Sequence, residues 1–255
     1  MFTALKRQKF LFEELVKRDF KEKYKRTVLG MWWSVLSPLL QLLVMRVVFS
    51  SFFGPDIPHY TIYLFCGKLV YKYFKDSTTG GMSSLMQNRD IISKVNVPKY
   101  LFLLSKNVSS LINFALTLAV FLLFVLADGL RFGPHFLALA FPILCLIVFN
   151  VGVGLVLSAL FVFFRDIHYL YDIFTLLLMY VSAIFYNVDI CPPLLQRLFL
   201  CNPVYCYIKY FRVVVLDGHL PSPAFHLLCA AYAAAMAAIG GWIYKKYNHQ
   251  FLYYM

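Results

Sequence analysis

Long apolar runs separated by short polar connections dominate the chain. Six of them are long enough to cross the roughly 30 Å of hydrocarbon in a bilayer. The second run also contains lysines, and the fourth contains the small residues Gly152–Gly154, which predict a close approach to another helix. The runs are Leu29–Phe53, Tyr60–Met86, Leu101–Ala127, Phe136–Phe164, Leu170–Tyr186 and Ala224–Tyr244. The pattern predicts an all-α membrane protein with six transmembrane helices.

The residues before the first run have the pattern of an amphipathic helix. Apolar side chains recur at every fourth position, and lysines and arginines fill the remaining surface. The apolar stripe consists of Phe12, Val16, Phe20, Tyr24 and Val28, with Leu11 and Leu15 beside it. We predict that residues 1–28 form a helix at the cytoplasmic interface of the membrane. The alternative is a basic tail that only sets orientation. No cleavable signal peptide is expected, because charged residues precede the first run.

One further segment, Leu194–Leu216, is apolar but is interrupted by charges and by Asn202-Pro203. If it crossed the membrane, the C-terminal lysines would lie opposite the basic N-terminal segment, against the positive-inside bias. We therefore predict re-entrant or interfacial helices on the outer side, broken at Asn202-Pro203, in an outer gate segment of about residues 187–220. Both termini are then cytoplasmic. Residues 29–244 form the transmembrane domain, and residues 245–255 form a cytoplasmic tail.

Composition excludes several classes of protein. Of the 255 residues, 61% are hydrophobic and 14% are charged, whereas soluble domains are about 45–50% apolar and about 25% charged. Soluble enzymes and nucleic-acid-binding proteins are therefore excluded. The net charge of +12 is concentrated beside the predicted spans, as expected for topology and lipid contact. The six cysteines contain no C-x-x-C pair and the six histidines lack metal-ligand spacing, so we expect no metal site and no catalytic residues.

Several segments, in a fixed order, resemble one family of transport proteins. They are RDFKEKYKRTVLGMWWSVLSPLL (Arg18–Leu40), YTIYLFCGKLVYKYF (Tyr60–Phe74), NRDIISKVNVPKYLFLL (Asn88–Leu104), LSALFVFFRDIHYLYD (Leu157–Asp172), SAIFYNVDICPP (Ser182–Pro193) and NPVYCYIKYFRVVVLDG (Asn202–Gly218). They resemble permeases of ABC transporters that export O-antigens, capsular polymers or teichoic acids. The resemblance covers nearly the whole chain. The chain departs from the family at Ala183, where proline is common, and at Lys68 and Lys72, where uncharged residues are common.

The resemblance implies a permease half located in the bacterial cytoplasmic membrane. Two copies would pair around a translocation path for a polyprenyl-pyrophosphate-linked polysaccharide. Each copy would dock one separate ATPase subunit, which would bind ATP and Mg²⁺, because this chain has no G-x-x-x-x-G-K-[ST] loop and no expected cofactor of its own. The alternatives are an exporter of drugs or small lipids, and a membrane enzyme acting on polyprenyl-linked sugars. The enzyme is disfavoured because acidic residues are sparse in the loops.

The segment Gln87–Tyr100 reads as a short amphipathic helix followed by Pro98. By resemblance, residues of about 87–99 form the coupling helix that fits a groove on the ATPase. The alternative is an ordinary loop whose charges set topology. The expected contact residues are Asp90, Ile91, Lys94 and Val95.

Lys68, Lys72 and Lys75 recur at i, i+4 and i+7, so they share one stripe of the second span with Tyr71 beside them. Charges within a span are costly and normally face a bundle interior or an aqueous path. We therefore predict that this stripe lines the translocation path and that the cargo is acidic or bears phosphate. The alternative is that the lysines pair with groups on neighbouring helices. Arg46, near the outer end of the first span, either lines the path or snorkels outward.

The N-terminal helix is expected to flank the substrate entrance in the inner leaflet. Its cations would meet the pyrophosphate there, whereas the alternative is that they only anchor the chain to lipid. The entrance residues are Arg18, Lys21, Lys25 and Arg26, and the outer gate residues are Asn202, Pro203 and Arg212.

Overall fold

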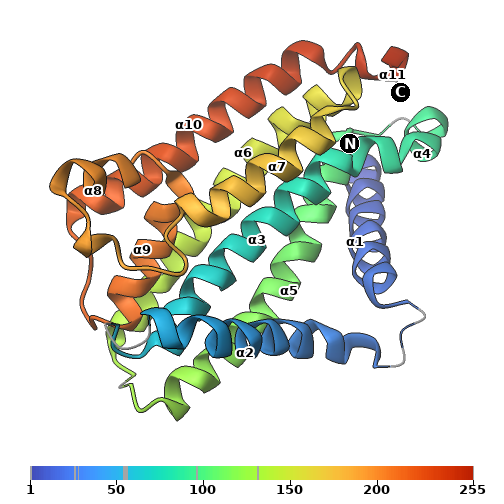
Figure 1. Ribbon diagram of the computed structural model, residues 1–255. Coiled ribbons are helices and arrows are strands. Elements are labelled where there is room, and N and C mark those ends of the chain that lie inside the picture. The colour runs from blue at the N-terminus through green and yellow to red at the C-terminus, as the bar shows by residue number, and fades with distance from the viewer. Residues whose placement is uncertain are drawn as a thin grey trace.

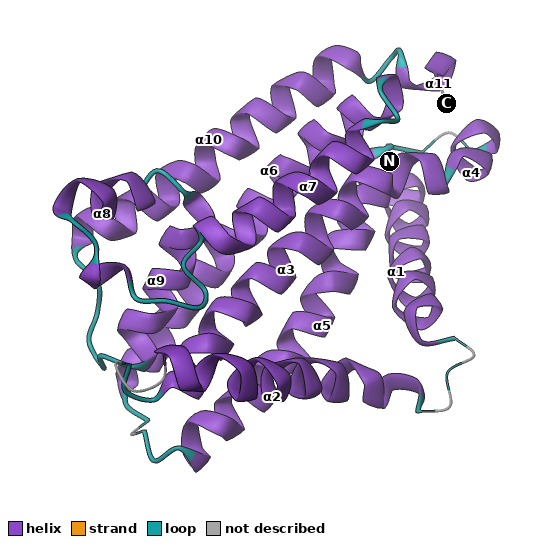
Figure 2. Ribbon diagram, in the orientation of Figure 1, coloured by secondary structure: helices purple, strands orange, loops and turns teal. Residues whose placement is uncertain are grey.

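The computed structural model describes residues 2–25, 27, 29–53, 57–95, 97–130 and 132–254. In chain order the elements are α1 (Phe2–Tyr24), η1 (Gly30–Trp32), α2 (Trp33–Phe53), α3 (Tyr60–Gln87), α4 (Arg89–Lys94), α5 (Tyr100–Ala127), η3 (Pro134–Leu139), α6 (Ala140–Phe163), α7 (Ile167–Val181), η4 (Val188–Ile190), α8 (Pro193–Phe199), α9 (Pro203–Val215), α10 (Pro223–Tyr247) and α11 (Phe251–Tyr254), where η denotes a 3₁₀ helix. Every element within the described ranges is a helix (Figure 2). The predicted all-α class is confirmed.

Helix α3 occupies the centre of the bundle (Figure 1). It packs against α5 and α6, and near its start against α9. Of its 28 residues, 18 are buried, so the helix that carries the lysine stripe is an interior helix. Aromatic rings connect it to its neighbours. The Phe65 ring meets Phe121 of α5 with centroids 5.2 Å apart, and the Phe74 ring meets Phe149 of α6 at 6.1 Å.

Helices α6 and α10 pack at very close range. A Cβ atom placed on Gly152 of α6 would overlap the backbone of Met236 and Ala237, and one placed on Gly240 of α10 would overlap the carbonyl of Gly152. Gly154 similarly lies against Gly81 of α3. The close approach expected from the small residues of the fourth run is therefore present.

Three described segments are long and apolar enough to cross a membrane, namely Tyr100–Ala127, Pro134–Phe163 and Pro223–Tyr247, and the bent pair α8–α9 makes a fourth if it counts as one span. The predicted number of six spans is not confirmed. Helix α3 carries four charged residues, and in α2 the side chains after Val44 are described only in part, so the apolar stretch is followed from Trp33 to Val44. Helix α7 has 15 residues and is therefore about 22 Å long, which is shorter than the hydrocarbon core.

Helices α8 and α9 meet at an angle of 104°. The break lies at Asn202-Pro203, as the sequence predicts. The Asn202 side chain accepts hydrogen bonds from the backbone N–H groups of Val204 (3.0 Å) and Tyr205 (3.3 Å), and Pro203 occupies the first turn, where no N–H is needed. Asn202 also donates to the Ser182 hydroxyl at 3.0 Å, which fixes the corner against the end of α7.

The segments next to both termini lie at one end of the bundle, together with α4 (Figure 1). We call this end the α4 end. Leu15 of α1, Ile92 of α4 and Phe251 of α11 are buried in one apolar cluster there. The Lys99 ammonium donates to the carbonyl of Asn248 at 2.6 Å, and burial lowers the pKa of Lys99. Helix α11 itself packs against α6 and places Phe251 near Phe163 and Tyr244, so the end of the chain joins the apolar cluster that also contains residues of α1 and α4.

The N-terminal helix is present and ends at Tyr24, whereas residue 28 lies outside the described residues. Its buried face differs from the predicted stripe. Leu15 is buried, while Phe12 and Val16 are only half-buried. The reason is that α1 packs against α5, so one side of the helix meets protein. Leu11 and Phe20 are also half-buried, whereas Phe10 is exposed.

Candidate functional site: a polar cavity between α1, α3 and α5

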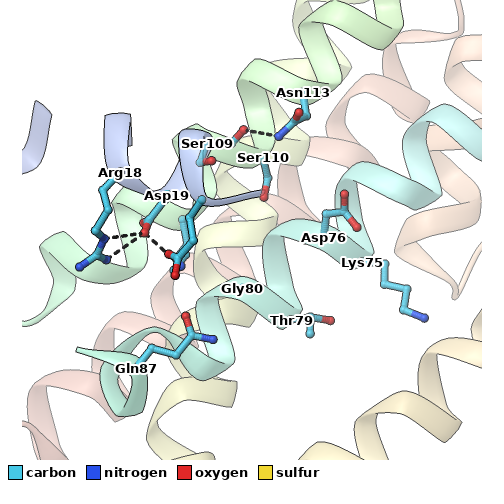
Figure 3. Close-up of a pocket in the computed structure, with 12 residues that line it drawn as sticks. Arg18, Asp19, Lys75, Asp76, Thr79, Gly80, Gln87, Ser109, Ser110 and Asn113 are labelled. Atoms are coloured by element: carbon cyan, nitrogen blue, oxygen red, sulfur yellow. Dashed lines mark hydrogen bonds and ion pairs between the residues drawn. The ribbon is translucent and has the colours of Figure 1, made fainter. Parts of the chain in front are cut away.

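A polar cavity of about 650 Å³ lies between α1, α3 and α5 (Figure 3). Three helices contribute its walls, each through residues at helical spacing. The lining residues are Arg18, Asp19 and Glu22 of α1, Lys75, Asp76, Thr79, Gly80 and Gln87 of α3, and Lys106, Ser109, Ser110 and Asn113 of α5. Charges of both signs therefore share the cavity with hydroxyl and amide groups. These groups can hydrogen-bond to a hydrated, hydroxyl-rich ligand.

The cavity exists because α3 and α5 turn small or polar faces toward α1. Gly80 and two serines of α5 replace the large apolar side chains that fill the rest of the bundle. Within α5, Asn113 donates to the carbonyl of Ser109 at 3.0 Å, and the Thr117 hydroxyl donates to the carbonyl of Asn113 at 2.9 Å. These bonds satisfy polar groups that would otherwise be costly to bury.

A second cavity of about 280 Å³ continues along the same helices, under α2. Asn113 lines both cavities, and a small gap between them is lined by Lys72, Asp76 and Asn113. Trp33 and Ser34 of α2 contribute the outer wall of the second cavity. The seam between α3 and α5 is therefore followed by two neighbouring cavities, a polar one under α1 and a more apolar one under α2.

The structure brings part of the predicted lysine stripe to this space. Lys75 lines the large cavity and Lys72 lines the second one, where its ammonium lies 3.9 Å from the Asp76 carboxylate. Lys68 is half-buried and lies a further turn along α3. Tyr71 is directed elsewhere, because its hydroxyl donates to the carbonyl of Thr175 in α7 at 2.5 Å.

The predicted entrance residues fall in different places. Arg18 lines the large cavity, so one residue of the predicted entrance and one of the predicted path, Lys75, share the same space. Lys21 and Lys25 are exposed on the surface of the chain. Arg26, and the side chain of the predicted path residue Arg46, lie outside the described residues.

Sequence reasoning missed the most buried charge of the cavity, Asp19. Its side chain is only 1% exposed. One carboxylate oxygen accepts hydrogen bonds from Arg18 at 2.8 and 3.2 Å and lies 3.1 Å from the Lys106 ammonium, and the other accepts from the Ser105 hydroxyl at 3.1 Å. The available signal was its position four residues after Leu15, on the face of α1 that packs against α5.

Helix α4 presents a polar face away from the bundle. Asp90 and Lys94 are exposed, Ile91 and Val95 are half-buried, and Ile92 is buried in the cluster of the α4 end. Of the predicted coupling residues, the two charged ones are therefore the more accessible to another protein.

At the opposite end of the bundle, Arg212 of α9 is 7% exposed. Its guanidinium donates to the carbonyls of Ala183 (2.9 Å), Ile184 (3.0 Å) and Tyr63 (3.4 Å), and it lies 3.4 Å from the centroid of the Tyr63 ring. It therefore holds the turn after α7 against α3. The predicted gate residues Asn202 and Arg212 both bond to this turn, at Ser182 and at Ala183.

Ala183 has a φ of 50°, which is a left-handed conformation. Proline cannot adopt it, because its ring fixes φ near −65°. A proline at this position, which the resemblance leads us to expect, would therefore prevent the observed backbone geometry.

Comparison of the chain with known protein families identifies its family. Residues 11–216 match the profile of the ABC-2 type transporter family. The chain belongs to this family. Among the relatives of this ABC-2 protein, the O-antigen export system permease protein RfbA of Klebsiella pneumoniae is 27% identical over 247 residues, covering 95% of both chains. The protein of the same name from Myxococcus xanthus is 26% identical, covering 94% of both.

A more distant relative of the ABC-2 chain is the polysialic acid transport protein KpsM of Escherichia coli, which is 20% identical over 84% of both chains. The relatives are named as permease or transport proteins. The resemblance found in the sequence is therefore confirmed, and together with its long apolar helices the family makes this chain an integral membrane protein.

Proposed function

We propose that the chain is the permease half of an ATP-driven exporter that moves a lipid-linked polysaccharide, such as an O-antigen, capsular polymer or teichoic acid, across the bacterial cytoplasmic membrane. The observation that carries the proposal is the alignment of 95% of the chain with an O-antigen export permease. The proposed lipid anchor is polyprenyl pyrophosphate. Two copies of the chain surround the path, since one bundle offers little room for a hydrated polymer.

The large polar cavity between α1, α3 and α5 supplies a physical basis for handling such a cargo. Sugar hydroxyls both donate and accept hydrogen bonds, and the hydroxyl, amide and charged groups of the large cavity provide both kinds of partner. Lys75 supplies a cation for phosphate or acidic sugars. The exposed Lys21 and Lys25 of α1 attract the pyrophosphate to the mouth of the cavity.

In this proposal the exposed face of α4, with Asp90 and Lys94, docks the ATPase subunit, which supplies the ATP and Mg²⁺. The α4 end is then cytoplasmic, and both termini are cytoplasmic with it. The corner between α8 and α9 lies at the outer mouth and acts as a gate. ATP hydrolysis and its cofactors are assigned to the ATPase subunit.

A second candidate cargo is a small lipid. An apolar cavity of about 370 Å³ lies between α3, α6, α7 and α9, and it is lined by residues that include Phe74, Phe149, Phe174 and Leu178. Such a lining suits an acyl or prenyl chain. An exporter of free lipid would use this cavity alone, whereas an exporter of a lipid-linked polymer would need the polar cavity as well.

The test is gene deletion in the source bacterium followed by complementation. We expect deletion to retain lipid-linked polymer inside the cell and the intact gene to restore it at the surface, measured by lectin or antibody labelling of whole cells. The variant Lys75→Ala should restore export poorly, whereas the control Lys245→Ala, an exposed lysine near the end of α10, should restore it fully. An unchanged amount of surface polymer after deletion would reject polysaccharide export and favour the hypothesis that the cargo is a small lipid.

A further inference from the structure

One hydrogen-bonded network connects α1 to the junction between α3 and α4. Arg18, besides pairing with Asp19, donates from its Nη2 atom to the side-chain oxygen of Asn88 at 2.8 Å. Asn88 is 1% exposed, and its amide nitrogen donates to the carbonyl of Ser84 at 2.7 Å. The network therefore spans α1, the last turn of α3, and α5 through Lys106.

Asn88 is the N-cap residue of α4, immediately before its first residue, Arg89. Its backbone N–H bonds to the carbonyl of Leu85 at 3.2 Å, and its own carbonyl accepts from the N–H groups of Ile91 and Ile92 at 3.0 Å each. It ends α3 and starts α4 within a single residue. A shift of α4 therefore moves Asn88, and Arg18 is attached to Asn88 by a charge-assisted hydrogen bond, which is stronger than a neutral one.

The other end of the network is held firmly. Because the Asp19 carboxylate is almost fully buried, it needs several partners to offset its lost hydration, and Arg18, Lys106 and Ser105 provide them. Arg18 therefore has one contact on its own helix and another, 70 positions away in sequence, at the start of α4. Both Arg18 and Asp19 also line the large polar cavity (Figure 3).

We infer that Asp19, Arg18 and Asn88 form a mechanical link that transmits movement of α4 to α1, and so to the wall of the polar cavity. The inference rests on the proposed function, in which α4 receives the movement of the ATPase and the cavity receives the cargo. The three side chains are positioning residues: they act by holding α1 and α4 in register. Arg18 is thus assigned to this link, while the exposed Lys21 and Lys25 remain available to an anionic headgroup.

The first test measures register directly. Spin labels on Glu13→Cys of α1 and Ser93→Cys of α4, both at exposed positions, report the distance between the two helices by pulsed electron paramagnetic resonance. The chain is reconstituted in lipid nanodiscs, with and without its ATPase. Serine replaces the cysteines that are not fully buried, which are Cys145, Cys191 and Cys201.

We expect a narrow distance distribution in the otherwise unchanged chain and a broad one with Asn88→Ala. Asn88→Asp keeps the oxygen that accepts from Arg18 and should keep the distribution narrow. Arg18→Ala removes the donor of the same hydrogen bond and should also broaden the distance distribution. The matched control is Lys17→Ala, which removes the neighbouring cation whose contact, at 2.9 Å, is to Glu14 of the same helix. An unchanged distribution in Asn88→Ala and Arg18→Ala would overturn the inference.

The second test distinguishes a link that transmits movement from a contact that only stabilises the fold. In the complete transporter, Asn88→Ala should hydrolyse ATP at the normal rate but export about tenfold less polymer per ATP, the change that follows from losing one hydrogen bond to a charged group. Asn88→Asp should restore the ratio. Parallel loss of hydrolysis and export would reject the link in favour of structural damage. Failure of the ATPase to bind α4 would instead appear as lost co-purification, leaving the distance measurement as an independent test.

Discussion

Arg212 stabilises an irregular turn inside the bundle by donating to two of its backbone carbonyls, those of Ala183 and Ile184, and it also donates to the carbonyl of Tyr63 in α3. The turn after α7 has no regular hydrogen-bonding pattern of its own, so its two carbonyls need an outside donor. Room for the guanidinium comes from Gly67, where a Cβ atom would lie 3.1 Å from the Arg212 Nη2 atom. The arginine and the glycine therefore form one local arrangement, contributed by α9 and α3.

We expect Arg212→Ala to lower the free energy of unfolding by about 3 kcal/mol, because each buried acceptor left unpaired costs on the order of 1–3 kcal/mol and such costs are not fully additive. Thermal unfolding of the purified protein in detergent measures the change. Arg197→Ala, at an exposed position on α8, is the matched control and should leave the melting temperature unchanged. Equal melting temperatures for the two variants would show that the Arg212 contacts contribute little.

At the scale of single elements, α11 is short but contributes a buried side chain to the α4 end. Helix α11 has four residues, yet Phe251 is fully buried. It packs in the same cluster as Ile92 of α4, and the Lys99 ammonium lies 5.6 Å from its ring centroid. The end of the chain therefore supports the segment proposed to dock the ATPase.

We expect Phe251→Ala to increase hydrogen exchange in Arg89–Lys94 without unfolding the bundle, since loss of a buried phenylalanine costs about 3–5 kcal/mol and α4 depends on this cluster. Mass spectrometry of deuterated peptides measures it. Tyr253→Ala removes a neighbouring aromatic side chain that is 88% exposed, and it should leave the exchange unchanged. Identical protection of α4 in both variants would contradict the proposed support.

The α6–α10 pair offers a second test with neighbouring residues. Gly240→Ala should destabilise the protein, because the added methyl group overlaps the backbone of Gly152. Gly241→Ala meets open space and should stabilise α10 by about 0.5–1 kcal/mol, the usual gain of alanine over glycine in a helix. Unfolding by denaturant should therefore show opposite shifts for two adjacent positions. If both variants changed the free energy of unfolding in the same direction, the close packing of α6 against α10 at Gly240 would be contradicted.

Local features could be predicted from the sequence because their causes are local. The corner at Asn202-Pro203 follows from a side chain that caps a helix and a ring that fits its first turn. The Asp19 network could not be predicted, since Arg18 meets a partner 70 positions away and Ser105 lies 86 positions from Asp19. Tyr71 shares the stripe of the lysines in sequence, yet its hydroxyl bonds to α7, because which helix covers which face is decided by packing.

At the scale of the whole molecule, both ends of the described chain lie at the α4 end (Figure 1). An even number of membrane crossings would place both ends on the same side, although the number six is not confirmed. Helix α3 does not meet the apolar criterion for a span, and two of its lysines, Lys75 and Lys72, line cavities under α1 and α2. A hydropathy profile includes the charges of such a helix but contains no information about the polar groups of neighbouring helices.

The interior position of α3 has a consequence for the biogenesis of the protein. A charged residue near the middle of an isolated helix costs about 2.5–3.5 kcal/mol on insertion into the bilayer, and α3 carries Lys68, Lys72, Lys75 and Asp76. Released alone from the insertion machinery, this helix would face lipid with those charges. Its polar surroundings are completed only by α5, the next long helix to be synthesised. If α3 spans the membrane, as the sequence predicts, we therefore expect the nascent chain to retain α3 in a protected site until α5 has emerged, so that the two helices enter the lipid as a pair.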